Sequence, residues 1–138
     1  MLQKMIPENN PKLKKNQNII TENTRLKLES VRKFLEENYF DSNITRESLA
    51  DSVGMSPDHL GRMYKKCTGE RISDYLNRLR IEAASKKLLG TADKIIDIAF
   101  EVGFGSLRSF NNVFRNSKDV SPSKYRECSL SNMKYSQN

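Results

Sequence analysis

The sequence has few of the residues from which catalytic and metal sites are usually built. It holds two cysteines, Cys67 and Cys128, and a single histidine, His59. Two isolated cysteines make neither a disulfide framework nor a metal-ligand cluster, and a reducing compartment explains them as free thiols. His59 and Cys67 fall on one predicted helix about two turns, or ~12 Å, apart, which is too far for a Cys/His pair. We therefore expect no enzyme, no metal ion and no cofactor.

Long apolar runs and glycine-rich loops are also absent. No run approaches the ~20 residues needed to cross a bilayer, and the N-terminal stretch has no apolar segment typical of a signal peptide. The glycines are dispersed, and Gly103-Phe104-Gly105 lacks the third glycine and the preceding strand of a nucleotide-binding loop. The chain is thus expected in the cytoplasm, without membrane contact.

Positive charge is what the sequence has in excess. Its 138 residues include 24 Lys and Arg against 17 Asp and Glu, for a formal net charge of +7, and the pI is about 9.5. The length allows one domain with a single modest core. A basic domain of this size predicts a polyanionic partner, and nucleic acid is the first to consider.

The hydrophobic pattern has the period of helices, and no segment shows the sustained alternation typical of a strand. Residues 1–23 are predicted to be a flexible arm or linker and residues 129–138 a disordered tail. Residues 24–128 are predicted to form an all-α domain of about seven helices. The expected core stripes are Leu28, Val31, Phe34 and Leu35; Leu49, Ala50 and Val53; Leu60, Met63, Tyr64 and Cys67; Tyr75, Leu76, Leu79, Ala83 and Leu88; Ile95, Ile98, Ala99 and Val102; and Phe110, Val113 and Phe114.

Part of this pattern occurs twice. Leu49-Ala50 and Val53-Gly54 return 49 residues later as Ile98-Ala99 and Val102-Gly103. One inserted residue then raises the offset between the copies to 50. With this offset the second copy has Phe110, Val113, Phe114, Arg115 and Tyr125 where the first has Leu60, Met63, Tyr64, Lys65 and Tyr75. Each copy predicts two short helices joined by a tight turn containing glycine, which is a helix-turn-helix unit. The fold class is therefore all-α, with units over 46–67 and 94–117 joined by one long helix from about Ser73 to Leu89.

The second helix of such a unit exposes the face opposite its core stripe, and that face enters the major groove of DNA. Arginine can make two hydrogen bonds to guanine and asparagine two to adenine, while Lys and Arg also neutralise phosphates. At about 100° per residue, the positions farthest from the core stripe are Asp58, Arg62 and Lys65 in the first unit and Arg108, Asn112 and Arg115 in the second.

The linking helix suits the distance between neighbouring grooves. Its predicted length of ~26 Å, extended by a turn at each end, approaches the ~34 Å between successive major grooves on one side of DNA. A solvated helix face is often basic without binding anything, so a helical protein-interaction module with an acidic partner is the alternative. Both second helices carry basic residues at the same positions relative to their core stripes, which favours double-stranded DNA over an acidic protein as the partner.

These residues resemble the AraC/XylS family of bacterial transcription regulators over about 100 residues, from Leu28 to Glu127. The resemblance implies a DNA-binding domain of two helix-turn-helix units on a seven-helix scaffold, usually activating transcription through contact with RNA polymerase. The matching stretches run over residues 49–57, 59–60, 64–66, 68–69, 75–80, 95–104, 110, 113–115 and 121–126.

The resemblance also implies roles for single residues. Lys65, Lys66, Arg115 and the helix N-termini at Ser56 and Ser106 would hold phosphates. Base edges would be read by Asp58, Gly61 and Arg62 in the first unit and by Leu107, Arg108, Asn111 and Asn112 in the second.

The first unit departs from the family pattern at two of these positions. Gly61 offers no side chain where a longer polar residue is common, and Asp58 is acidic at a position facing the groove. The sequence therefore predicts that the second unit, with Arg108 and Asn112, reads the more restricted half-site. Family members usually carry a sensor, dimerisation or receiver domain before this module, so the chain either regulates alone or is the C-terminal part of a longer protein.

Overall fold

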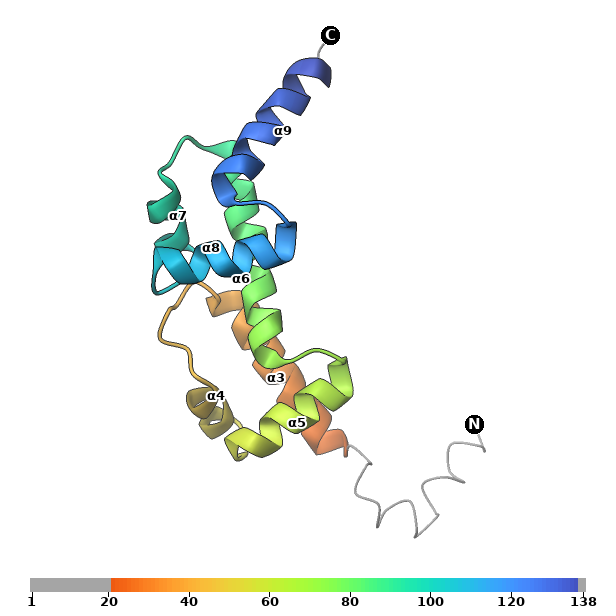
Figure 1. The fold of residues 1–138 in the computed structure, drawn as a ribbon. Helices are drawn as coiled ribbons and strands as arrows, with labels where there is room; N and C mark the ends of the chain where they lie inside the picture. The colour runs from red at the N-terminus through yellow and green to blue at the C-terminus, as the bar shows by residue number, and fades with distance from the viewer. Residues whose placement is uncertain (1–20, 137–138) are drawn as a thin grey trace, which may run out of the picture.

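The computed structural model describes residues 21–136, which form seven helices and no strand (Figure 1). None of these helices is long and apolar enough to span a membrane. The predicted fold class, an all-α domain with two helix-turn-helix units joined by one long helix, is confirmed. The helices are α3 (Glu22–Asn38), α4 (Arg46–Ser52), α5 (Pro57–Thr68), α6 (Ile72–Gly90), α7 (Ile95–Glu101), α8 (Leu107–Lys118) and α9 (Pro122–Ser136).

Side-chain caps mark where three of the four helices of the two units begin, and α7 has none. The hydroxyls of Thr45, Ser56 and Ser106 accept hydrogen bonds from the backbone N–H three residues on, at the starts of α4, α5 and α8. Such a cap satisfies one of the unpaired donors of the first turn and contributes about 1 kcal/mol. At the other end of α8, Asp119 adopts a left-handed backbone with φ 68°. These local signals explain why the sequence pattern located both units.

The apolar side chains form two cores, one for each unit. The linking helix α6 contributes to both, through Ile72 and Tyr75 to the first core and through Ile81, Ala84 and Leu88 to the second. The second core contains a row of aromatic rings with centroids 5.3 to 5.6 Å apart, from Phe104 through Phe110 and Phe114 to Tyr125. The first core is made of Leu28, Val31, Leu35, Leu49, Ala50, Leu60, Tyr64, Ile72 and Tyr75.

A buried arginine in the middle of α6 joins the two halves. The Arg80 guanidinium donates to the carbonyl oxygens of Tyr39 (2.7 Å) and Asp41 (2.9 Å), which follow α3. It also lies 5.7 Å from the ring centroid of Phe104, in the second core. Burial lowers the pKa of Arg80, but arginine stays protonated at neutral pH. One cation therefore binds the end of α3 and the second unit together.

The absence of a side chain at Gly103 leaves space for the Arg80 guanidinium and the Tyr39 carbonyl oxygen. The φ of Gly103 is 111°, and a Cβ added to it would lie 2.5 Å from the Tyr39 oxygen and 2.6 Å from Nε of Arg80. Both distances are far inside van der Waals contact, and the Tyr39 oxygen belongs to the backbone and cannot simply rotate away. The second copy of the Val-Gly pair thus carries a packing requirement that the first copy lacks.

A second arginine joins the helices on either side of the second unit in a similar way. Arg126, in α9, donates to the carbonyl oxygens of Leu88 (2.9 Å) and Thr91 (3.1 Å) at the end of α6. Each helix-turn-helix unit is therefore flanked by an arginine that lies on the helix following the unit and holds the end of the helix preceding it. These bonds satisfy carbonyl groups that the helix ends leave unpaired.

Several predictions made from the pattern are wrong. The tail expected to be disordered from Ser129 is helical to Ser136 in the structure, and no glycine or proline interrupts this segment. Cys67 is exposed, since the first core reaches only as far as Tyr64 along α5.

Helix boundaries and one core residue also differ. Phe34 is 45% exposed, because it lies at the edge of the α3 face that buries Val31 and Leu35. Helix α3 begins at Glu22 and α6 ends at Gly90, each within two residues of the expected boundary. Residues 1–20 of the predicted arm lie outside the described residues.

We predict that Gly103→Ala destabilises the protein by roughly 2–5 kcal/mol, because a left-handed backbone costs about 1–2 kcal/mol and the overpacking against Arg80 adds about 1–3. Gly54→Ala is the matched control: φ is 70° at Gly54, and no atom lies within 4 Å of the added Cβ. Thermal and denaturant unfolding of both variants measure the difference. Equal destabilisation by the two substitutions would contradict the packing role of Gly103.

Candidate nucleic-acid interface

The second helices of the two units, α5 and α8, lie on the same side of the molecule. In Figure 1 they run in about the same direction, one below the other, in front of α3 and α6. Helix α5 buries Leu60 and Tyr64, and α8 buries Phe110 and Phe114. The opposite faces of both helices are therefore turned away from the cores and toward solvent.

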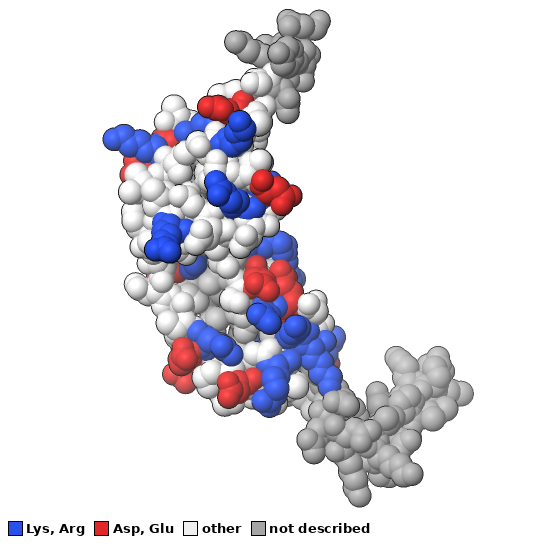
Figure 2. Space-filling model, in the orientation of Figure 1, with Lys and Arg blue, Asp and Glu red and all other residues white. Residues whose placement is uncertain are grey.

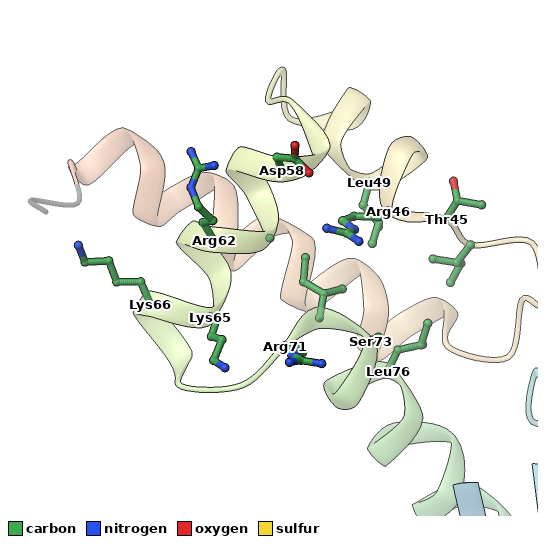
Figure 3. Close-up of a pocket in the computed structure, with 13 residues that line it drawn as sticks. Thr45, Arg46, Leu49, Asp58, Arg62, Lys65, Lys66, Arg71, Ser73 and Leu76 are labelled. Atoms are coloured by element: carbon green, nitrogen blue, oxygen red, sulfur yellow. The ribbon is translucent and has the colours of Figure 1, made fainter. Parts of the chain in front are cut away.

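The outer face of α5 carries the residues predicted for the first unit. Asp58, Arg62, Lys65 and Lys66 are exposed, and Gly61 is half-buried among them. Figure 3 shows Arg62, Lys65 and Lys66 extending away from the helix. The Ser56 hydroxyl accepts from the backbone N–H of His59, so this side chain serves as the N-cap of α5.

The outer face of α8 carries the residues predicted for the second unit. Arg108, Asn111, Asn112 and Arg115 are exposed along it. Leu107 is half-buried and packs against the second core, which leaves only part of its side chain available to a ligand. Ser106 caps α8 by accepting from the backbone N–H of Ser109.

Each outer face borders a cleft formed with the first helix of its unit and the start of the helix that follows. The cleft of the first unit has a volume of about 830 Å³ and that of the second about 360 Å³. Their linings correspond through the repeat: Arg46, Gly61, Arg62, Lys65, Arg71, Ile72 and Ser73 in the first cleft match Ile95, Asn111, Asn112, Arg115, Ser121, Pro122 and Ser123 in the second. The two surfaces are thus copies of one architecture with different side chains.

Two basic residues of the first cleft were missed by the sequence reasoning. Arg46 begins α4 and Arg71 is the N-cap of α6, and both line the cleft beside α5 (Figure 3). The angular arithmetic considered only α5, so it could not identify residues from neighbouring helices. A comparison of the two repeats was the available signal, because the matching residues of the second unit, Ile95 and Ser121, are uncharged.

The charge of the first cleft is strongly one-sided. Arg46, Arg62, Lys65 and Arg71 line it against a single acid, Asp58, and among the described residues none of these four cations forms an ion pair. Figure 2 shows the blue side chains gathered over α5 and the start of α6, with others spaced over α8. An unpaired basic surface of this kind attracts a polyanion.

Comparison with known proteins agrees with this geometry. A family model of a helix-turn-helix domain matches residues 49–127. The multiple antibiotic resistance protein MarA of Escherichia coli is 31% identical over 99 residues, covering 72% of this chain and 77% of MarA. The chain belongs to the AraC/XylS family of helix-turn-helix regulators. Its membership confirms the resemblance inferred from the motifs.

Other relatives are longer than this chain. The bifunctional transcriptional activator/DNA repair enzyme AdaA of Bacillus subtilis is 32% identical over 108 residues, which cover 78% of this chain and 51% of AdaA. The chain spans 21% to 51% of the length of the first curated relatives that it matches. The DNA-binding domain of AdpA, solved with a target DNA, superposes with a TM-score of 0.68 at 25% identity, covering 73% of this chain and 90% of that domain.

Proposed function

We propose that this chain is a sequence-specific regulator of transcription that places α5 and α8 in two adjacent major grooves of one DNA duplex. The observation that carries the proposal is the placement of two basic, exposed second helices on one side of α6. The hydrogen bonds from Arg80 on α6 to the carbonyl oxygens of Tyr39 and Asp41 join the end of α3 to this helix. Two separate helices held in one orientation suit a ligand that repeats along its axis.

The dimensions of the domain support the same mode of binding. Helix α6 has 19 residues and is therefore ~28 Å long. With a turn at each end it approaches the ~34 Å that separates major grooves on one side of B-DNA. The AdpA domain, which has this fold, is described with a target DNA bound. One copy of this chain is accordingly proposed to cover about one turn of the duplex.

The exposed residues divide into two proposed roles. Arg62 in the first unit and Arg108, Asn111 and Asn112 in the second supply groups that can form hydrogen bonds with base edges, and Asp58, Gly61 and Leu107 border them. Phosphates are met by Lys65, Lys66 and Arg115 and by the backbone N–H groups at the starts of α5 and α8, whose caps are Ser56 and Ser106.

The regulatory partners are proposed from the relatives. AdaA is named a transcriptional activator, and we propose activation through contact with RNA polymerase in the bacterial cytoplasm. A sensor or receiver domain before this module is part of the same proposal, because the chain matches only part of several relatives. We assign this chain no catalytic step, since the exposed residues of α5 and α8 suit binding; the repair activity in the name of AdaA belongs to that protein.

The salt dependence of binding tests the proposal in general. If the basic faces meet ~6–8 phosphates, the logarithm of affinity falls with the logarithm of salt concentration with a slope of roughly −5 to −7. Fluorescence anisotropy of a labelled duplex at several salt concentrations measures the slope. A slope near zero, or equal binding to selected and scrambled duplexes, would instead support a module that binds an acidic protein.

Substitutions on α8 and α5 separate base reading from phosphate binding. Arg108→Ala or Asn112→Ala is expected to relax base preference at particular positions and to cost about 1–3 kcal/mol, because each removes a side chain capable of two hydrogen bonds to a purine. Lys65→Ala is expected to weaken all duplexes about equally. Titration against a panel of single-base variants of a selected duplex distinguishes the two patterns.

The control for lost charge is Lys33→Ala. Lys33 is exposed on α3, on the side opposite the buried Leu28, Val31 and Leu35 and therefore away from α5. The Lys33→Ala substitution should leave the affinity for DNA almost unchanged. If Arg108→Ala and Asn112→Ala behaved like Lys65→Ala, the assignment of α8 as a base reader would be wrong.

A further inference from the structure

The outer face of α5 has a gap at its centre that a residue from another helix fills. Gly61 lies among the residues proposed to face DNA and contributes no side chain. A Cβ built at Gly61 would lie 3.1 Å from Nη1 of Arg46 and 3.9 Å from its Cδ. The guanidinium of Arg46, which reaches from α4 toward α5 in Figure 3, therefore lies directly against the place where a side chain at position 61 would begin.

The guanidinium of Arg46 is available to a ligand. Arg46 is exposed, and no hydrogen bond or ion pair joins it to another residue in the described part of the chain. Its N–H groups form a planar fork that matches two acceptors placed side by side. It borders the same cleft as Arg62 and Asp58.

The second unit fills the corresponding place differently. The residue that matches Gly61 is Asn111, which is exposed and carries its own polar side chain. The residue that matches Arg46 is Ile95, which is partly buried and packs against the second core. One unit thus combines an arginine on its first helix with a glycine on its second, and the other combines an apolar residue with an asparagine. In both units one polar group lies beside the same turn of the second helix.

We propose that Arg46 is a specificity-determining residue of the first unit, which contacts a base edge from the place that Gly61 leaves open. A guanidinium is a donor only, and guanine presents two acceptors, N7 and O6, in the major groove. The expected preference is therefore for guanine at one base pair of the first half-site. This inference rests on the proposed binding of DNA by α5, and it gives the first unit a second base reader beside Arg62.

The experiment starts from duplexes that the wild-type chain selects from a random pool. Arg46→Ala is expected to reduce discrimination at one base pair of the first half-site by about 5- to 150-fold and to leave the second half-site unchanged. Arg46→Lys keeps the charge and lacks the fork, so it is expected to retain more affinity while losing the same preference. Lys33→Ala controls for net charge, and circular dichroism confirms that each variant is folded.

A second variant tests whether Arg46 and position 61 share one place. Gly61→Asn gives the first unit the residue that the second unit has there, and its side chain would displace the Arg46 guanidinium. The base preference is expected to change at the same base pair that Arg46→Ala affects. In the double variant, Arg46→Ala should then have little further effect, which a double-mutant cycle measures.

Three outcomes of these experiments test the proposed role of Arg46. If the wild-type chain selects no sequence, the proposed function itself fails. If selection succeeds and Arg46→Ala leaves every preference unchanged, or weakens all duplexes equally as a phosphate contact would, the role of Arg46 in reading bases is overturned. Changes confined to one base pair, shared by Arg46→Ala and Gly61→Asn, support it.

Discussion

The arrangement of the two units depends on one buried guanidinium. Arg80 satisfies two carbonyl groups after α3 and lies against Phe104, so it touches both halves of the molecule at once. A buried charge is tolerated only where its donors are paired, and removal of a partner is costly. Because Arg80 lies midway along α6 and Gly103 allows its close approach, these contacts pack the end of α3 and the second unit against each other in one arrangement. The relative placement of α5 and α8 is thus a consequence of packing.

The repeat supplies two copies of one scaffold and leaves the binding surfaces free to differ. Core stripes, the turns and the serine caps of α5 and α8 recur in both units because each unit needs the same internal packing. The cleft residues do not need to match, and here they have diverged: the first cleft is lined by Arg46 and Arg71 where the second has Ile95 and Ser121. Divergence at solvent-facing positions costs little stability, so the two units can acquire different preferences on one fold.

The ion pairs also distinguish the first cleft from the rest of the surface. Arg32 pairs with Glu29 and Glu36 on α3, Arg78 with Glu70 and Lys87 with Glu101. Exposed pairs such as these contribute little to stability, but they neutralise cations outside the clefts. The cations that stay unpaired in the first cleft are the ones available to a polyanion. The distribution of acids, as much as that of bases, therefore defines the candidate interface.

Local features of the sequence were sufficient to predict the helices and to predict that most residues of the candidate interface lie on exposed helix faces. The caps at Thr45, Ser56 and Ser106, the 3.6-residue period and the repeat are all written within short stretches, so the exposed faces carrying Arg62 and Arg108 followed from angular arithmetic. Tertiary contacts decided the rest, because they join residues far apart in the chain. They bring the Arg80 guanidinium against Gly103 and leave Cys67 outside the core. They also bring Arg46 over Gly61, where no periodicity within α5 could have placed it.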